Sequence, residues 1–180
     1  EPHDLAPETK WFDMAQASIN AIREVDTNTL IMVGGNDWSS AERWIEQSDT
    51  LKFLKDPANN LAFEAHVYFD KDASGTYKYS YEEEECYPEK GIDRVKPFVE
   101  WIKQNKFHGF IGEYGIPDND PRWNETLDLF LGYLQENGIN GTYWAAGPWW
   151  DSYFMAITPK DGKDRPQMPI IEKYTSTLKK

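Results

Sequence analysis

The sequence predicts an α/β fold with a parallel β-sheet, because strand-like and helix-like segments alternate along the chain. When helices separate successive strands, the strands can run in the same direction. No glycine-rich phosphate loop follows a predicted strand, so a nucleotide-binding doubly wound sheet is disfavoured. The short apolar runs that we interpret as strands cover residues 29–33, 61–68, 107–115 and 141–146.

The helices are predicted from apolar residues that recur at intervals of three and four. The first covers residues 11–25, and Thr9 is its expected N-cap. After the first strand we expect a polar loop at residues 34–38 and a short helix from about Ser40, and a long polar loop follows the second strand. The later helices are expected at residues 91–105, 121–138 and 169–178.

The composition excludes several classes of function. The chain has 180 residues, the length of one domain, and a formal net charge of −12. Nucleic-acid binding needs a basic surface that neutralises phosphates, and this sequence does not supply one. The acidity also argues against an anionic membrane surface, and no apolar run approaches the roughly 20 residues that span a bilayer. The single cysteine, Cys86, excludes an internal disulfide.

Aromatic residues are abundant, with 8 Trp, 10 Tyr and 9 Phe in the chain. A large aromatic core would explain this number, and so would a sugar-binding cleft, because the apolar faces of sugar rings stack on aromatic side chains. Position helps to separate the two explanations. The tryptophans in predicted helical segments, which we interpret as packing residues, are Trp11, Trp44, Trp101 and Trp123.

Polar, acidic and aromatic residues gather at the carboxyl ends of the predicted strands. A (β/α)8 barrel carries its active site at this end of its strands, so the sequence favours such a barrel. Glu113 lies at the end of an apolar strand between Gly112 and Gly115, which allow close backbone approach. Burying a carboxylate is costly, so Glu113 is expected either to form a structural ion pair or to take part in a reaction. The strand-end residues are Asn36, Asp37, Trp38, His66, Tyr68, Glu113 and Trp144.

Five motifs occur in order along the chain, each at a predicted strand end, and together they resemble glycoside hydrolase family 5, the cellulase-type retaining β-glycosidases. The resemblance covers essentially the whole chain. It implies the C-terminal half of a (β/α)8 barrel, from strand 4 or 5 to strand 8, and a single partial catalytic domain at residues 1–180. The motifs are EPHD at 1–4, GGNDW at 34–38, HVY at 66–68, GEYG at 112–115 and YW at 143–144.

The resemblance implies a role for each matching residue. Glu1 corresponds to the general acid/base and Glu113 to the nucleophile. His66 and Tyr68 correspond to the histidine and tyrosine near the nucleophile, and we expect Tyr68 to donate a hydrogen bond to Glu113. His66 would position Tyr68 or the sugar, although a structural strand histidine is the alternative. Trp144 corresponds to the floor of the sugar subsite, with a core residue as the alternative. Further expected substrate-binding residues are Trp38, Trp149, Trp150, Asn36 and His3.

The implied activity is retaining, endo-acting hydrolysis of β-1,4-glucan by a secreted enzyme, without a metal ion or a cofactor. A retaining mechanism needs two carboxyl groups about 5–5.5 Å apart. Mannan or xyloglucan are the alternative substrates. A non-catalytic carbohydrate-binding half-barrel is a different class of function, but it would not need Glu113, His66 and Tyr68.

The resemblance implies that strands one to three and most of the fourth should precede Glu1, and the arginine, histidine and asparagine that they would carry have no counterpart in this sequence. We therefore expect the chain to be a piece of a longer enzyme, to combine with a second polypeptide that supplies the first half, or to pair with a copy of itself through its open sheet edges. We expect the isolated chain to be inactive, because by itself it cannot hold the complete site that the resemblance implies. An α-ammonium group on Glu1 would also favour the ionised carboxylate and make it a poorer acid.

Overall fold

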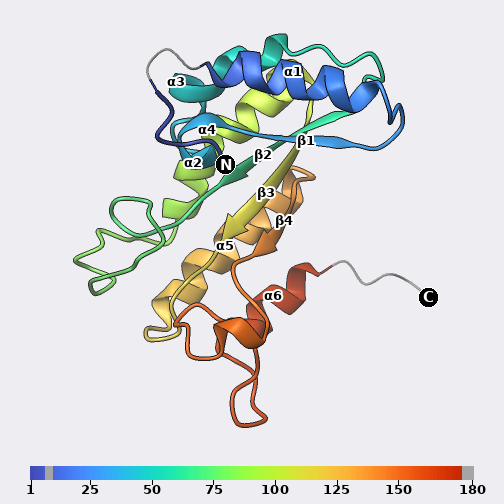
Figure 1. Ribbon diagram of the computed structural model, residues 1–180. Helices are drawn as coiled ribbons and strands as arrows, with labels where there is room; N and C mark the ends of the chain where they lie inside the picture. The colour runs from blue at the N-terminus through green and yellow to red at the C-terminus, as the bar shows by residue number, and fades with distance from the viewer. Residues whose placement is uncertain (7–9, 176–180) are drawn as a thin grey trace. The chain divides into compact units, whose positions relative to one another are not determined.

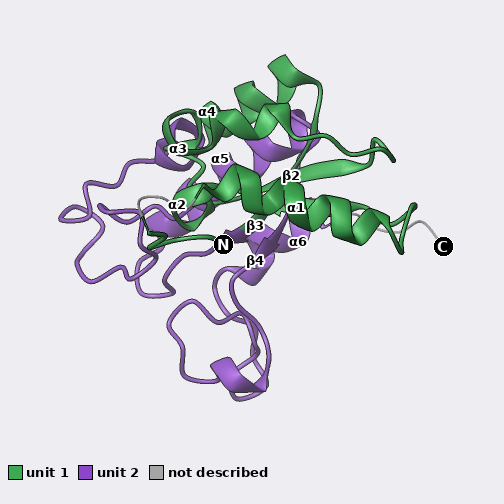
Figure 2. Cartoon of the chain, turned by 45° about the horizontal axis from the view of Figure 1, so that its top comes forward, with its two compact units in different colours: residues 1–66, 95–112 green, residues 67–94, 113–180 purple. Residues whose placement is uncertain are grey.

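A computed structural model describes residues 1–6 and 10–175 of the chain. The chain divides into two compact units, which Figure 2 shows in different colours. Unit 1 comprises residues 1–66 and 95–112, and unit 2 comprises residues 67–94 and 113–180. Among the described residues, no helix combines the length and the apolar character that crossing a membrane requires.

The strands form a four-stranded sheet in the order β1-β2-β3-β4 (Figure 1). Strands β1 and β2 are parallel, and Ile31 pairs with Leu61 at the start of their register. Every predicted strand is present, with ends that differ by up to three residues. The observed strands are β1 (Ile31–Gly34), β2 (Leu61–His66), β3 (His108–Tyr114) and β4 (Asn140–Tyr143).

The long helices also occur where the apolar periodicity places them. Thr9, the predicted N-cap, and the last residues of the final predicted helix lie outside the described residues. The observed helices are α1 (Trp11–Arg23), α2 (Asn36–Ser39), α3 (Trp44–Ser48), η1 (Asp49–Phe53), α4 (Lys90–Asn105), α5 (Arg122–Glu136), η2 (Pro148–Trp150) and α6 (Met168–Tyr174).

The polar loop predicted at residues 34–38 is wrong in one respect. Residues 36–39 form the short helical turn α2, whose residues Asp37, Trp38 and Ser39 have φ angles of 58°, 54° and 53°. This left-handed backbone has no apolar periodicity, so the sequence pattern does not reveal it. The short helix expected from about Ser40 begins later, at Trp44.

Unit 1 has an aromatic core. Trp44 and Trp101 are fully buried and pack edge-to-face against each other with ring centroids 5.4 Å apart. The indole of Trp101 donates a hydrogen bond to Asp49, so its polar edge is satisfied. A buried ion pair between Arg23 and Asp56 connects the end of α1 to the turn before β2. This core supports the carboxyl ends of β1 and β2.

Unit 2 has a separate aromatic core. Phe130 of α5 packs against Phe69 and against Tyr114 of β3, and Trp123 packs against Tyr77. Trp44, Trp101 and Trp123 are all buried, which confirms the prediction that these tryptophans are packing residues. Trp11 is half-buried, and its indole donates a hydrogen bond to the carbonyl of Gly34 at 2.8 Å.

Candidate active site

Glu113 lies next to the carboxyl end of β3, and its carboxylate belongs to unit 2. The hydroxyl of buried Tyr68 donates a hydrogen bond of 2.7 Å to Oε2 of Glu113. A main-chain hydrogen bond of 2.9 Å from Val67 to the carbonyl of Glu113 keeps the two segments in register. The hydrogen bond that the sequence predicts from Tyr68 to Glu113 is therefore confirmed.

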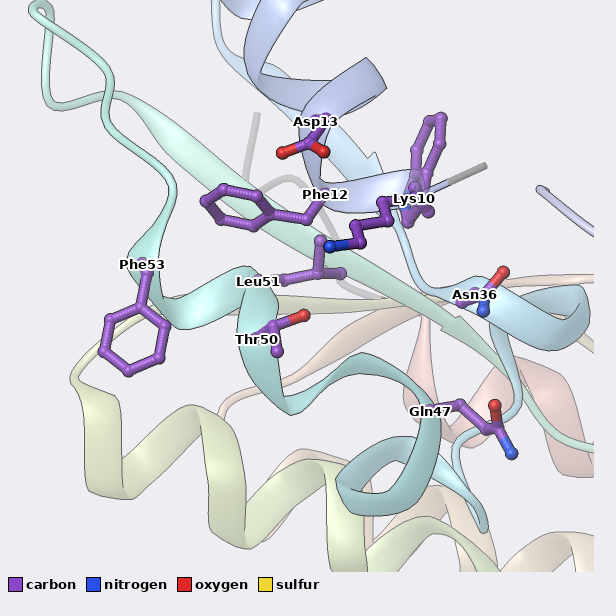
Figure 3. A pocket seen from close by; sticks show the side chains of 9 residues that line it. Lys10, Phe12, Asp13, Asn36, Gln47, Thr50, Leu51 and Phe53 are labelled. Carbon is purple, nitrogen blue, oxygen red and sulfur yellow. The ribbon is translucent and has the colours of Figure 1, made fainter. Parts of the chain in front are cut away.

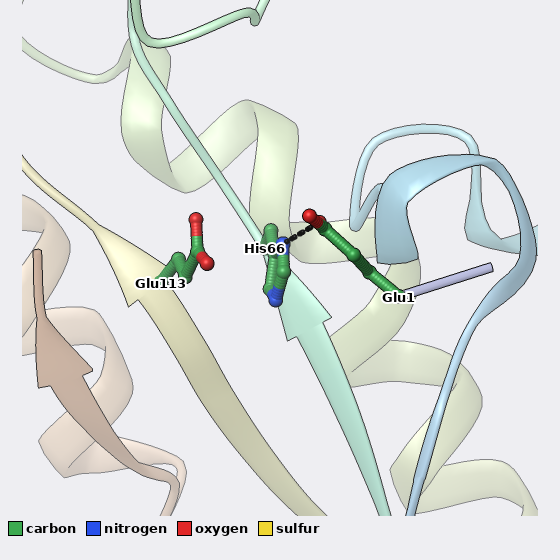
Figure 4. Close-up of side chains that lie close together, drawn as sticks. All are labelled: Glu1, His66 and Glu113. Carbon is green, nitrogen blue, oxygen red and sulfur yellow. Dashed lines mark ion pairs between the residues drawn. The ribbon is translucent and has the colours of Figure 1, made fainter. Parts of the chain in front are cut away.

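In unit 1, His66 at the end of β2 contacts two carboxylates. Its Nδ1 lies 3.0 Å from Oε2 of Glu1, an ion pair that Figure 4 shows, and its Nε2 lies 2.7 Å from Oε1 of Glu64. The imidazole side chain is 13% exposed, whereas that of Glu1 is 41% exposed. The two contacts orient the imidazole ring through both of its nitrogens.

Glu64 was not among the candidate residues predicted from the sequence. A usable signal existed, because Glu64 precedes His66 by two residues in a strand, and residues two apart point to the same face. The signal was weak because the carboxylate sits within an apolar run and has no motif of its own. Its contact with His66 becomes evident only in the three-dimensional structure of the strand.

Both glycines that flank Glu113 permit a close approach, as predicted. A Cβ atom on Gly112 would lie 1.7 Å from Oε1 of Glu64, and a Cβ atom on Gly115 would lie 2.4 Å from the carbonyl oxygen of Trp144. The first glycine makes room for the partner of His66 within unit 1. The second makes room for the main chain of Trp144 within unit 2.

Trp144 follows β4 in unit 2 and begins a series of aromatic contacts. Its ring packs edge-to-face on Trp150 with centroids 5.0 Å apart, and Trp150 contacts Tyr153 at the same distance. Burial raises the pKa of Tyr153, and the negative charge of Glu113 adds to this increase in pKa. Tyr153 therefore belongs to the surroundings of Glu113, although no sequence motif identified it. The predicted substrate-binding roles of Trp144 and Trp150 remain predictions.

Trp38 and His3 form a stacked pair in unit 1. Their ring centroids are 4.7 Å apart with an interplanar angle of 11°. The amide of Trp38 donates a hydrogen bond to the carbonyl of Pro2, which joins the segment around Glu1 to the turn α2. Trp38 is 46% exposed, so one side of an aromatic surface remains accessible. The two residues were predicted separately, and the structure brings them together.

Two other predicted residues lie apart from these contacts. Trp149 of unit 2 is 88% exposed. Asn36 of unit 1 lines a cavity of about 560 Å³ near the start of α1, together with side chains from residues 47–53 (Figure 3). That cavity contains none of the predicted catalytic residues. The expectation that the chemistry needs no metal ion remains a prediction.

Comparison with known proteins identifies the family. Residues 1–149 match the family described as cellulase, glycosyl hydrolase family 5. The probable endo-beta-1,4-glucanase B of Aspergillus kawachii is 37% identical over 180 residues, covering 97% of this chain and 52% of that protein. Endoglucanase 3 of Humicola insolens is 35% identical over 167 residues, covering 90% of this chain and 41% of that protein.

Solved structures show the same relationship. The structure of Pseudomonas stutzeri endoglucanase Cel5A in complex with cellobiose has a TM-score of 0.88 and 44% identity, covering 97% of this chain and 52% of that chain. Cel5A (EG2) from Hypocrea jecorina has a TM-score of 0.78 and 26% identity, covering 94% of this chain and 53% of that chain. These similarities confirm the predicted half of a (β/α)8 barrel.

The chain spans about half the length of the curated relatives it matches. The family match nevertheless includes the segments that carry Glu1, His66, Tyr68, Glu113 and Trp144. The chain therefore belongs to the family described as cellulase, glycosyl hydrolase family 5.

Proposed function

We propose that this chain supplies the catalytic carboxylates of a retaining endo-β-1,4-glucan hydrolase, with Glu113 as the nucleophile and Glu1 as the general acid/base. The observation that carries the proposal is the 2.7 Å hydrogen bond from Tyr68 to Glu113 at a strand end, in a member of a cellulase family. A nucleophilic carboxylate must be ionised and aimed, and a buried phenol donor serves both needs.

The proposed reaction has two displacements. Glu113 attacks the anomeric carbon of the glucosyl unit while the bond to the leaving glucan oxygen breaks, and Glu1 transfers its proton to that oxygen. Water then attacks the same carbon, Glu1 accepts a proton from the water, and the bond to Glu113 breaks. Two inversions at one carbon give net retention. The mechanism requires that the two carboxyl groups come about 5–5.5 Å apart in the active enzyme.

The surrounding residues have complementary roles in this proposal. His66 orients Glu1 and offers a titratable neighbour during the proton transfers, and Glu64 holds His66. Trp144 provides an apolar floor for the sugar ring. The stacked pair of Trp38 and His3 provides a further platform, because flat aromatic surfaces fit the apolar faces of glucose units.

The complete activity belongs to a polypeptide or assembly that contains both halves of the barrel. The coverage supports this proposal, because the chain accounts for about half of each relative. Self-pairing of the half-barrel is the alternative arrangement. We place the enzyme outside the cell, because an insoluble or high-molecular-mass glucan must be cut before its sugars can be taken up.

The decisive test replaces the nucleophile. In the longest polypeptide that carries this sequence, Glu113→Ala should lower kcat on carboxymethylcellulose by at least about 10³-fold. Azide should restore part of the activity and give a glycosyl azide of inverted configuration, because the small anion occupies the place of the lost carboxylate. Nuclear magnetic resonance of the first product of the unmodified enzyme should show the β-anomer.

The control is Glu100→Ala, which removes a carboxylate of α4 whose side chain is 53% exposed. Its activity should equal that of the unmodified enzyme. Rates on mannan and xyloglucan, measured with the same preparation, decide the substrate. Full activity of Glu113→Ala, or a product of inverted configuration from the unmodified enzyme, would rule out the proposed mechanism.

A further inference from the structure

We infer that Asp70 is a positioning residue. Its buried carboxylate stabilises the loop of residues 70–77, and this loop packs against the ring of Tyr68. The loop thereby keeps the Tyr68 hydroxyl within hydrogen-bond distance of Glu113. The inference rests on the proposed function for its catalytic consequence. Its structural part stands on contacts within unit 2 alone. Asp70 lies two residues after Tyr68 and does not take part in the proposed chemistry.

The carboxylate of Asp70 is the centre of the loop. The residue is 1% exposed. Its Oδ1 accepts a hydrogen bond from the amide of Gly75 at 3.0 Å, and its Oδ2 accepts from the amides of Thr76 and Tyr77 at 3.0 and 3.2 Å. The hydroxyl of Ser74 donates to the same Oδ2 at 3.1 Å. A buried carboxylate with these donors stabilises one loop conformation, because each donor would lose its partner in any other.

The loop places Gly75 against the ring of Tyr68. Gly75 has a φ of +71°, in the left-handed region that favours glycine, and a Cβ atom there would lie 3.0 Å from two carbons of the Tyr68 ring. The backbone of Gly75 therefore forms one wall of the space that the ring occupies. Because Asp70 binds the amide of Gly75, the carboxylate determines where this wall stands.

The backbone on both sides of Tyr68 is held as well. Arg94 donates hydrogen bonds to the carbonyls of Tyr68 and Asp70 at 2.5 and 2.6 Å. The hydroxyl of Tyr77 accepts a hydrogen bond from the amide of Phe69 at 2.9 Å and donates one of 2.6 Å to the carbonyl of Gly115. Burial raises the pKa of Tyr77 well above its ordinary value, so its hydroxyl remains a donor.

Tyr77 thus joins the segment that carries Tyr68 to the strand end that carries Glu113. Its own amide is bound by Asp70, so the carboxylate supports both the donor and the acceptor of the 2.7 Å hydrogen bond. An error of about 1 Å in the position of a catalytic group can cost about 10²-fold in rate. A residue that sets this position therefore affects kcat without contacting the sugar.

The test combines a spectroscopic and a kinetic measurement on the longest polypeptide that carries this sequence. The protein is labelled with 3-fluorotyrosine, and the resonance of Tyr68 is assigned by its loss in Tyr68→Phe. Asp70→Asn should shift or broaden this resonance. It should also lower kcat by about tenfold to a hundredfold with little change in KM.

Two comparisons separate positioning from a general structural effect. In a Tyr68→Phe background, Asp70→Asn should lower kcat by less than about twofold more, because its effect acts through the Tyr68 hydroxyl. The control is Asp161→Asn, the same change at an exposed carboxylate elsewhere in unit 2. It should leave the Tyr68 resonance and kcat unchanged.

If Asp70→Asn does not fold, Tyr77→Phe decides, because it keeps the packed ring and removes only the two hydroxyl hydrogen bonds. It should perturb the Tyr68 resonance and lower kcat, as Asp70→Asn is expected to do. An unmoved Tyr68 resonance in a folded variant, or full additivity with Tyr68→Phe, would overturn the inference. If Tyr68→Phe itself retains full activity, the proposed function fails instead, while the resonance still reports on positioning.

Discussion

The two candidate catalytic carboxylates are held in different ways. Glu113 lies at the end of a strand, where the phenol of Tyr68 donates to it and a buried loop supports that phenol. Glu1 lies in the segment before α1, half in solvent, and its contact is the imidazole of His66, which Glu64 holds from its other nitrogen. In unit 2, a loop held by hydrogen bonds to backbone amides supports Tyr68, and Tyr68 holds Glu113. In unit 1, Glu64 holds His66 and His66 holds Glu1, so the carboxylate is positioned by successive side-chain contacts.

This difference matches the different demands of the two proposed roles. A nucleophile keeps one protonation state before the attack, so a neutral donor that favours the anion suits it. A general acid/base must lose and regain a proton, so a titratable imidazole beside it is a better partner than a fixed cation. Because side-chain contacts position Glu1, we expect activity to be more sensitive to a small displacement of the side chains around Glu1 than to one of the backbone around Glu113.

Among changes to residues that support the two carboxylates, crowding the unit 1 contacts should reduce activity most. Gly112→Ala would place a methyl group 1.7 Å from Oε1 of Glu64, so Glu64 must move and His66 loses a partner. We expect kcat/KM to fall by about 10²-fold, measured on a soluble β-glucan. The fluorotyrosine resonance of Tyr68 should stay in place, because that contact belongs to unit 2.

The matched control is Gly132→Ala in α5, where the added methyl group would lie 3.4 Å from the Tyr174 hydroxyl. Activity should be unchanged and stability equal or slightly higher, since alanine is the better helix former. If Gly112→Ala is as active as Gly132→Ala, the prediction that activity depends on the side-chain contacts of unit 1 is wrong.

A second prediction concerns the stability of unit 1. The hydrogen bond from the Arg23 guanidinium holds the pKa of Asp56 below its ordinary value of 3.8. A lowered carboxyl pKa contributes stability that is present above the ordinary pKa and is lost as the pH falls through the folded-state pKa. Asp56→Asn should lower the melting temperature by about 5 °C at pH 7. The difference from the unmodified protein should shrink below about pH 4.

Hydrogen exchange followed by mass spectrometry shows where this loss of stability falls. Asp56→Asn should reduce the protection of α1 in unit 1 and leave that of α5 in unit 2 unchanged. An equal loss of protection in both helices would mean that the two units unfold as one, and the contrast between them would not extend to stability.

Changes at Trp149, which is 88% exposed, should have the mildest consequences. Trp149→Ala should raise KM for long glucans about fivefold and leave kcat and the melting temperature nearly unchanged, because stacking on one indole contributes about 1 kcal/mol. Trp149→Phe should restore most of the affinity. A change in kcat with an unchanged KM would place Trp149 in the support of Trp144 and Trp150 instead of in substrate binding.

Much of the fold could be predicted because its elements have strong local patterns. The helices α1, α4 and α5 follow apolar periodicity, and β2 and β3 are apolar runs bounded by polar segments. The turn at residues 36–39 could not be predicted in the same way. Its left-handed backbone depends on contacts such as the amide of Trp38 with the carbonyl of Pro2, which join segments far apart in sequence.

The α/β alternation, the family resemblance and the candidates Glu1, His66, Tyr68 and Glu113 could be read from the sequence, because periodicity and short motifs are local properties of the chain. The side chains that support these candidates became evident only from the folded chain. Glu64 fits against Gly112, and Asp70 binds four donors of its own loop, because folding leaves space beside one glycine and directs backbone amides at one carboxylate. Such pairings depend on three-dimensional space and on buried donors, neither of which a linear pattern encodes.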